Sequence, residues 1–194
     1  MTAPTFYYDF SSPYSYFSAH RVDVLMPTAV RWQPILFGAL IIDIGKEPWS
    51  WEDTPARAKR MDECAQRAQV LGLPLKWPEG WPRQTYSVLV LRAALVAEGL
   101  GHLREFSLAA FRYGLGEGQD LSDPTVVGAI ATDVGLDANA VLAATQEPEI
   151  KLRLRDATNS ARELGVTGVP TVAAAGELFW GDDRLAEAAA ALQP

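Results

Sequence analysis

The pattern of hydrophobic and polar positions divides the chain into a short strand-rich beginning, a long helical middle and a strand-rich end. Residues 5–10 are mostly aromatic, which predicts a short buried strand, and the serines and proline at 11–13 predict a helix start. We expect this helix over residues 14–26. Apolar and polar residues alternate from 30 to 36, which predicts a second strand that ends in a turn at Phe37-Gly38.

Helical spacing of apolar residues takes over from residue 53 to about residue 165. Glycine, proline and aspartate separate the apolar and alanine-rich runs, so that each run predicts one helix. The predicted helices cover residues 57–71, 85–98, 103–115, 123–134, 139–145 and 148–164. The chain then returns to strand character with a predicted hairpin of residues 171–175 and 178–180, and a last amphipathic helix is expected over 184–192.

This order of elements predicts the fold class. Strand, helix, strand, a long helical segment, a hairpin and a final helix are the order of an α/β thioredoxin-like fold that is interrupted by a large α-helical insertion. We therefore expect a discontinuous thioredoxin-like domain made of residues 1–44 and 166–194. The inserted α-helical domain is expected to comprise residues 45–165.

Composition and charge limit the possible classes of function. The 194 residues are 48% hydrophobic, which suffices for one sizeable core in one compact unit. Seventeen basic and 24 acidic residues give a net charge of −7, and this argues against a nucleic-acid partner because phosphate binding requires basic patches. No apolar run approaches the roughly 18 to 20 residues that span a membrane. The N-terminus lacks a signal-peptide pattern, so we expect no membrane association and a cytoplasmic location.

Cysteine and histidine usage argues against two further kinds of site. Cys64 is the only cysteine, so it cannot form an internal disulfide; we interpret it as a small helix residue, with a reactive role as the alternative. His20 and His102 lie in different predicted helices, without acidic or cysteine neighbours at ligand spacing. The sequence therefore predicts neither a metal site nor a Ser/His/Asp triad.

Two segments far apart in the sequence carry the candidate chemistry. At the start of the first predicted helix the chain reads Ser12-Pro13-Tyr14-Ser15, where a disulfide oxidoreductase of thioredoxin type has Cys-x-x-Cys. A proline loop at Val169-Pro170, just before the last hairpin, is expected to face it. Because hydroxyl groups replace both thiols, we expect no electron transfer at this position.

Five motifs together resemble the 2-hydroxychromene-2-carboxylate isomerase family, a relative of the kappa-class glutathione transferases in the DsbA-like thioredoxin superfamily. They are DFSSPYSYF at 9–17, GKEPW at 45–49, WPRQT at 81–85, GVTGVPTV at 165–172 and LFWGDDRL at 178–185. The motifs follow the family order across nearly the whole chain. The resemblance implies a homodimer with glutathione as its cofactor, in which Ser12 replaces the nucleophilic cysteine because glutathione supplies the sulfur.

Ser12 and Val169-Pro170 each allow two interpretations. A helix N-terminus and a hydroxyl donor favour the charged form of a thiol, so Ser12 is a candidate thiolate stabiliser; the alternative is a plain N-cap. If the Val169-Pro170 peptide bond is cis, Val169 would present its backbone N–H and C=O to the cysteinyl unit of glutathione. The alternative is an ordinary proline at the start of a strand.

Charged residues complete the candidate cofactor site. We expect Asp182 and Asp183, at the start of the last predicted helix, to bind the γ-glutamyl amino group, or else to act as plain helix caps. Lys46 and Arg57 are expected to attract the glycyl carboxylate of glutathione or the carboxylate of a substrate. The alternative for both is a solvated surface charge.

Departures from the residues usual in the resembling family leave its substrate open. The replacements are a lysine for asparagine, an arginine for lysine, an arginine for tyrosine and a glutamine for asparagine, at Lys46, Arg57, Arg60 and Gln84. Aromatic residues near the expected cleft suit a flat aromatic substrate, although they suit the hydrophobic core as well. These aromatic residues are Tyr14, Tyr16, Phe37, Trp49 and Trp81.

We therefore expect a glutathione-dependent isomerase that acts on an unsaturated aromatic carboxylic acid. Ser12 would stabilise the glutathione thiolate, which adds reversibly to an unsaturated carbon and lets the neighbouring bond rotate. The alternatives are a kappa-like glutathione transferase and a non-redox thioredoxin-like module that binds peptides or thiols. A disulfide oxidoreductase that uses Cys64 is the least favoured, because no second cysteine exists to resolve a mixed disulfide.

Overall fold

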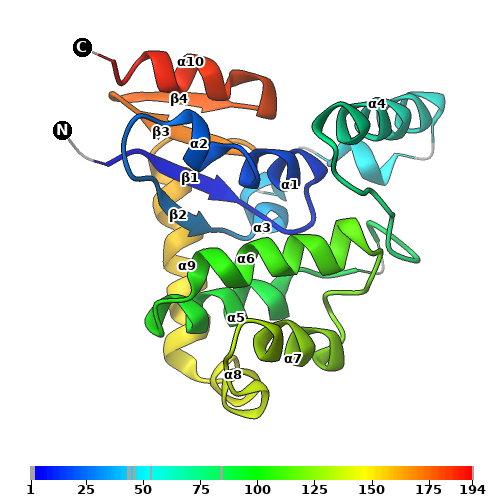
Figure 1. Ribbon diagram of the computed structural model, residues 1–194, viewed down its shortest axis with the longest axis vertical. Helices are drawn as coiled ribbons and strands as arrows, with labels where there is room; N and C mark the ends of the chain where they lie inside the picture. Colours follow the sequence, from blue (N-terminus) through cyan, green and yellow to red (C-terminus); the bar gives the residue numbers. More distant parts are fainter. Residues whose placement is uncertain (1–2, 43–44, 46, 53, 84, 194) are drawn as a thin grey trace.

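One mixed β-sheet forms the centre of the molecule (Figure 1). The computed structural model describes residues 3–42, 45, 47–52, 54–83 and 85–193, and within them four strands pair in the order β2-β1-β3-β4. The strands are β1 (Thr5–Tyr8), β2 (Arg31–Pro34), β3 (Thr171–Ala174) and β4 (Glu177–Trp180). β1 is parallel to β2 and antiparallel to β3, and β3 and β4 form the C-terminal hairpin. The predicted thioredoxin-like arrangement is confirmed.

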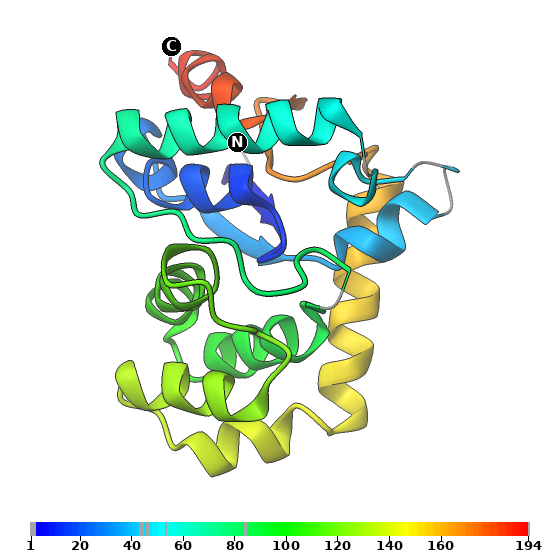
Figure 2. The ribbon, with the colours of Figure 1, turned by 90° about the vertical axis from the view of Figure 1, so that its right-hand side faces the viewer.

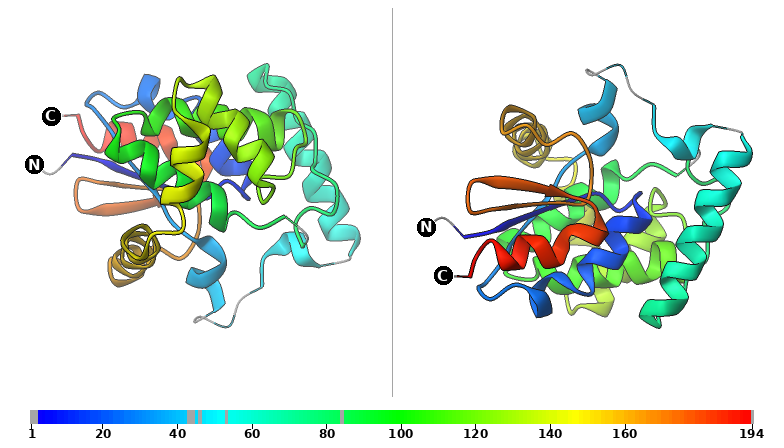
Figure 3. Two further views of the ribbon diagram at one scale, coloured as in Figure 1. Left: turned by 90° about the horizontal axis from the view of Figure 1, so that it is seen from below. Right: turned by 90° about the horizontal axis from the view of Figure 1, so that it is seen from above.

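Helices cover both faces of this sheet and form a bundle beside β2. The α-helices are α1 (Pro13–Ala19), α2 (Val22–Leu25), α3 (Phe37–Ile42), α4 (Pro55–Leu71), α5 (Val88–Gly99), α6 (Leu103–Phe111), α7 (Pro124–Asp133), α8 (Ala138–Ala144), α9 (Pro148–Glu163) and α10 (Leu185–Ala190). Three shorter turns are η1 (Trp49–Trp51), the π-helical η2 (Arg112–Gly116) and η3 (Asp182–Arg184). Figure 3 shows α1, α2 and α10 on one face of the sheet and α9 on the other.

Local sequence signals account for many of the helix boundaries. Proline occupies the first turn of α1, α4, α7 and α9, where its missing N–H costs no hydrogen bond. The side chains of Thr54, Asp123 and Asp137 cap α4, α7 and α8 by accepting backbone N–H groups. Gly72 ends α4 in the left-handed conformation. None of the helices in the described part of the chain is both long enough and apolar enough to cross a membrane.

Side chains that alternate along β1 divide the hydrophobic core between the two faces of the sheet. Phe6 and Tyr8 are fully buried in the larger cluster, which continues into the bundle through Phe106 of α6. Tyr7 points to the opposite face, where it packs with the smaller cluster that includes Ala161 of α9. Because the larger cluster joins the sheet to the bundle without a break, the helical segment shares the core of the sheet. The domain division at residues 45 and 165 stays a prediction.

Two predicted elements near the N-terminus differ from the structure. The prediction of a turn at Phe37-Gly38 is wrong, because α3 begins at Phe37. The side chains of Leu40 and Ile41 in this helix are buried. The single helix predicted over 14–26 is interrupted between α1 and α2, at the position of Arg21. The guanidinium of Arg21 turns toward Asp182, 161 residues further along the chain, and the sequence pattern carries no signal for this contact.

A buried hydrogen bond between hydroxyl groups joins the sheet to the bundle. The Tyr8 hydroxyl of β1 and the Ser107 hydroxyl of α6 lie 2.6 Å apart, and both side chains are fully buried. Tyr8→Phe keeps the ring but leaves the Ser107 hydroxyl without this partner. We therefore expect the variant to lower the free energy of unfolding by about 1 to 2 kcal/mol, measured by urea denaturation.

Tyr7→Phe is the matched control for this measurement. Tyr7 is the next residue of β1, it is only half-buried, and its side chain lies on the other face of the sheet. Loss of its hydroxyl is expected to change the free energy of unfolding by less than about 0.5 kcal/mol. Equal stability of the Tyr8 variant and the unsubstituted protein would contradict a stabilising role for the hydrogen bond.

Candidate functional site

A large cavity lies at the end of the sheet where β1 stops and β3 starts. Its volume is about 690 Å³, within the roughly 300 to 1,000 Å³ that is usual for small-molecule sites. The walls come from the start of α1, the loop at residues 168–170, η1, α4, and the segments 81–88 and 180–183. Figure 2 shows α4 crossing the molecule next to α1, so that it closes one side of the site.

Ser12 lies at the start of α1 and faces the loop before β3. Its hydroxyl caps the helix by accepting the Ser15 backbone N–H at 3.2 Å, and it donates to the Val169 carbonyl at 3.4 Å. Ser12 also lines the cavity, although it is only 9% exposed. Ser12 is therefore the N-cap of α1, and its role toward a thiolate stays a prediction. The hydroxyl also has a long, weak donor bond that a stronger acceptor in the cavity could replace.

The Val169-Pro170 peptide bond is cis. The sequence alone did not decide between the cis and trans isomers. Val169 and Pro170 both line the cavity. The Val169 carbonyl accepts the Ser12 hydroxyl, whereas the Val169 N–H has no hydrogen-bond partner within the described residues. Of the two backbone groups expected to face a ligand, the N–H is therefore the available one.

Asp9 follows β1 and holds the end of the sheet in place through two hydrogen bonds. We did not identify it as a site residue from the sequence. One carboxylate oxygen accepts the Ser11 N–H and the other accepts the Phe37 N–H, each at 2.9 Å. Burial raises the pKa of Asp9, while these two backbone bonds and the hydroxyls of Ser11 and Ser87 oppose the increase. The carboxylate thereby ties the turn before α1 to the start of α3. An aspartate directly after a buried strand is the sequence signal that could have found it.

Asp182 joins three elements of the site through its carboxylate. One oxygen pairs with the Arg21 guanidinium at 2.7 Å and the other pairs with the Arg67 guanidinium at 2.7 Å. The Ser18 hydroxyl of α1 donates to the first oxygen at 3.4 Å. The interpretation of Asp182 as a helix cap is wrong, because Gly181 is the N-cap of η3 and the Asp182 oxygens bind arginines instead. Its contact with a γ-glutamyl amino group stays a prediction.

Asp183 differs from its neighbour in being exposed while still lining the cavity. Gly181 precedes it with φ 121°, a conformation that side chains rarely adopt, and a Cβ at Gly181 would collide with the Asp183 carboxylate. The glycine thus lets the chain bend tightly from β4 into η3. Of the two adjacent aspartates, Asp183 is the one whose carboxylate remains open to the cavity.

The structure describes one of the two basic residues that we expected at the cofactor, Arg57. Lys46 lies outside the described residues. The Arg57 guanidinium donates to the Ser50 carbonyl at 2.8 Å and to the Trp81 carbonyl at 3.3 Å, and Arg57 does not line the cavity. In the structure Arg57 therefore holds two wall segments together. The arginines that do line the cavity are Arg60 and Arg67, both on α4.

Most of the expected aromatic residues line the cavity. Tyr14, Phe37, Trp49 and Trp81 line the cavity, and the ring centroids of Trp49 and Trp81 are 5.9 Å apart. Tyr16 is instead a core residue, 1% exposed, whose hydroxyl donates to the Pro74 carbonyl. The cavity is therefore bordered by several aromatic rings, and the Trp49 and Trp81 rings are tilted by 58° to one another. A planar ligand can stack on one of these rings and meet the edge of another.

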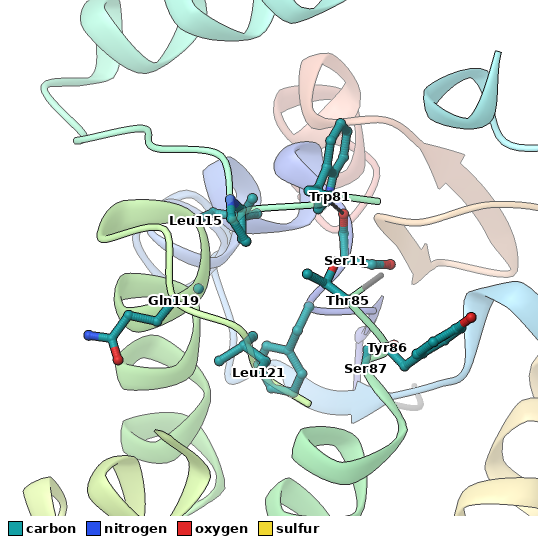
Figure 4. A pocket seen from close by; sticks show the side chains of 11 residues that line it. Ser11, Trp81, Thr85, Tyr86, Ser87, Leu115, Gln119 and Leu121 are labelled. Atoms are coloured by element: carbon teal, nitrogen blue, oxygen red, sulfur yellow. Dashed lines mark hydrogen bonds between the residues drawn. The ribbon is translucent and has the colours of Figure 1, made fainter. Parts of the chain in front are cut away.

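A second, much smaller pocket of about 20 Å³ lies next to Trp81, between Ser11, Thr85 and Leu115 (Figure 4). The residues that line both spaces are Ser11, Trp81, Thr85, Tyr86 and Ser87. The Trp81 indole N–H donates to the Ser11 carbonyl at 3.3 Å. This bond and the Arg57 contact fix Trp81 in position, and the small pocket has room for about one water molecule.

Cys64 lies behind the cavity, on the inner face of α4. Its side chain is fully buried, and burial raises the pKa of the thiol to about 11. The residue belongs to the hydrophobic core, as expected for a small helix residue. Within the described residues there is also no group of three or more histidine, cysteine or acidic side chains that could hold a metal ion.

Comparison with known proteins places the chain in a family. The model of the DsbA-like thioredoxin domain matches residues 5–193. The 2-hydroxychromene-2-carboxylate isomerase of Sphingobium xenophagum is 30% identical over 184 residues, which are 93% of this chain and 92% of that protein. The chain belongs to the 2-hydroxychromene-2-carboxylate isomerase family. The resemblance seen in the five sequence motifs is thereby confirmed.

Solved structures agree with this membership at the level of the fold. A structure of 2-hydroxychromene-2-carboxylate isomerase has a TM-score of 0.86 and 24% identity, and the match covers 95% of this chain and 91% of that one. The cytosolic disulfide reductase DsbM of Pseudomonas aeruginosa, solved with GSH, has a TM-score of 0.67 and 20% identity, with 98% and 96% covered. Both structures therefore share the fold of this chain.

We predict that the two adjacent aspartates have different effects on stability. Asp182→Asn removes the charge that pairs with Arg21 and Arg67, so we expect it to lower the free energy of unfolding by about 2 to 3 kcal/mol. Asp183→Asn is the matched control, since Asp183 is exposed, and should change it by less than about 0.5 kcal/mol. Urea denaturation measures both, and similar losses in the two variants would contradict the assignment.

We also predict that Cys64 is unreactive in the folded protein. Its thiol is buried and its pKa is raised to about 11, so that little thiolate forms at neutral pH. Labelling with an aromatic disulfide reagent should be slow in buffer and complete within the mixing time in denaturant. Fast labelling of the native protein at pH 7 would revive a reactive role for Cys64.

Proposed function

We propose that this protein is a glutathione-dependent isomerase that acts on an unsaturated aromatic carboxylic acid. The observation that carries the proposal is the Ser12 hydroxyl at the start of α1, facing a cavity that also presents the Val169 N–H. Family membership supports the isomerase activity, since the curated relative is named an isomerase. The DsbM structure with GSH supports the choice of cofactor, because that protein shares the fold.

The residues around Ser12 fit a thiol ligand. The cavity has no cysteine of its own, because Cys64 is buried behind its wall. Bound glutathione would supply a nucleophilic sulfur, which adds reversibly to an unsaturated carbon of the substrate and lets the neighbouring bond rotate. Ser12 can turn its hydroxyl from the Val169 carbonyl, 3.4 Å away, toward this sulfur. Its donor hydrogen and the N-terminus of α1 then both favour negative charge at that point.

Backbone groups on the opposite side would align the cofactor. The free Val169 N–H suits a peptide carbonyl in an extended ligand, in the manner of one β-strand that pairs with another. At the far end of the cavity, Asp183 offers an open carboxylate for the γ-glutamyl amino group. Asp182 contributes by fixing η3 and α4 in place through its arginine pairs. The role expected of Lys46 toward the glycyl carboxylate remains part of the proposal.

The cavity leaves space for a second ligand beside the cofactor. The Trp49 and Trp81 rings border it on the side away from η3, and the Tyr14 ring lies 6.4 Å from that of Trp49. Aromatic surface of this kind favours a planar ring system. A kappa-like transferase would use the same thiolate and differ only in keeping the sulfur on the product, so product analysis separates the two activities.

We predict that Ser12→Ala removes most of the activity. The variant loses the hydroxyl that stabilises the thiolate, so turnover of a chromene carboxylate with glutathione should fall by about 100-fold or more. The pKa of bound glutathione, followed by thiolate absorbance near 240 nm, should lie below the free value of about 8.5 in the unsubstituted protein and rise in the variant. Calorimetry with glutathione measures binding itself.

Ser15→Ala is the matched control for Ser12→Ala. Ser15 is the other serine of the Ser-Pro-Tyr-Ser segment, and its hydroxyl is buried, unpaired within the described residues and absent from the cavity wall. Its replacement should leave turnover and the thiol pKa unchanged. If the unsubstituted protein fails to bind glutathione at millimolar concentration but binds extended peptides, a peptide-binding module replaces the isomerase as the explanation of the site.

A further inference from the structure

The wall formed by α4 carries an arginine, Arg60, that has no acidic partner among the described residues. Arg60 lines the cavity and is exposed, and its side chain makes no ion pair or hydrogen bond with any residue that the structure describes. The Arg60 guanidinium lies over the Trp49 ring, 5.7 Å from the ring centroid. Arg60 is therefore a cation at the cavity whose N–H groups remain available.

The other cationic groups near this wall are already engaged. Arg67 pairs with Asp182 through two nitrogens at 2.7 Å. Arg57 donates to the carbonyls of Ser50 and Trp81. Glu63, the acidic residue three positions after Arg60, lines the cavity but pairs with Lys59 at 3.8 Å. Within the described part of the cavity wall, Arg60 is thus the arginine that is left to meet an anionic ligand.

The spacing along α4 explains why Arg60 points into the site. Arg60, Cys64 and Arg67 follow one another at intervals of four and three residues, so that they share one face of the helix. Cys64 on this face is fully buried and Arg67 reaches Asp182 in the cavity wall. The same face therefore directs Arg60 toward the aromatic end of the cavity, one turn before Cys64.

The contact with Trp49 makes Arg60 well suited to a carboxylate. A guanidinium that lies over an aromatic ring is restrained in position, while the N–H groups at its edge remain free for a two-point hydrogen bond. Trp49 in turn lies beside Trp81, with ring centroids 5.9 Å apart. A planar aromatic acid could thus contact the indole wall with its ring and reach Arg60 with its carboxylate.

We propose that Arg60 binds the carboxylate of the aromatic substrate and thereby selects anionic over neutral ligands. The inference rests on the proposed function for the identity of the ligand, but the binding it predicts does not depend on turnover. From the sequence we expected Arg57 to attract a substrate carboxylate, and our proposal assigns this role to Arg60.

Ligand binding without glutathione tests this assignment. The probes are cinnamate, a planar aromatic acid, and cinnamamide, its neutral counterpart of the same shape, with binding followed by quenching of tryptophan fluorescence. The unsubstituted protein should bind cinnamate more tightly than cinnamamide. Arg60→Gln should weaken cinnamate binding by about tenfold or more, as expected for the loss of a charge-assisted hydrogen bond, and change cinnamamide binding less than about twofold. The affinity of Arg60→Lys for cinnamate should lie between those of the unsubstituted protein and Arg60→Gln.

Lys151→Gln is the matched control for the loss of charge. Lys151 lies on α9, is exposed, makes no ion pair within the described residues and does not line the cavity. The variant has the same net charge as Arg60→Gln and should bind cinnamate like the unsubstituted protein. If Lys151→Gln and Arg60→Gln weaken cinnamate binding equally, or if the unsubstituted protein does not prefer cinnamate, the assignment of Arg60 is overturned.

Calorimetry with glutathione and with γ-glutamylcysteine separates the two possible sources of the carboxylate. Under our proposal, Arg60→Gln binds both thiols as tightly as the unsubstituted protein does. If Arg60→Gln loses affinity for glutathione but keeps it for γ-glutamylcysteine, which lacks the glycyl carboxylate, Arg60 serves the cofactor and the assignment is overturned. Failure of the unsubstituted protein to bind glutathione would instead contradict the proposed function, while the comparison of cinnamate with cinnamamide would still decide the role of Arg60.

Discussion

The antiparallel pairing of β1 with β3 is the constraint on which the whole site depends. Tyr7 near the end of β1 pairs with Thr171 at the start of β3, so the residues that follow one strand lie beside those that precede the other. Ser12 and Val169 are 157 positions apart in the chain and nevertheless come within hydrogen-bond distance. Any change in this register would move the hydroxyl away from the proline loop, because successive side chains in a strand point to opposite faces.

Two buried carboxylates stabilise this arrangement in different ways. Asp9 binds backbone N–H groups and so fixes the turns that leave β1 and β2. Asp182 binds two arginines and so fixes α4, a helix that buries few of its own side chains, against α1 and η3. A charge that is buried in this way is tolerated only with such partners. The two aspartates therefore maintain the shape of a cavity whose ligands they need not contact.

The two ends of the cavity differ in the kind of group that lines them, so each end suits a different part of a ligand. Near η3 an open aspartate and the starts of α1 and β3 present groups that a peptide can bind. Near η1 the surface is aromatic and carries Arg60, which has no ion-pair partner in the described part of the chain. Ser12 lies between them, at the helix N-terminus where negative charge is most favourable. This order along the cavity suits the thiol cofactor and the aromatic acid that we propose as ligands.

The sequence by itself determined the fold class, most helix boundaries and the motif residues Ser12, Val169 and Pro170, because these depend on local periodicity, on proline and capping signals and on the order of the elements. It did not distinguish Arg57 from Arg60, or Asp182 from Asp183, since neighbouring residues of one type give the same pattern. Only the tertiary structure decided which arginine faces the cavity and which aspartate is buried between arginines. The reason is physical: those outcomes depend on contacts such as Arg67 with Asp182, 115 residues apart, which form only when the sheet brings distant segments together.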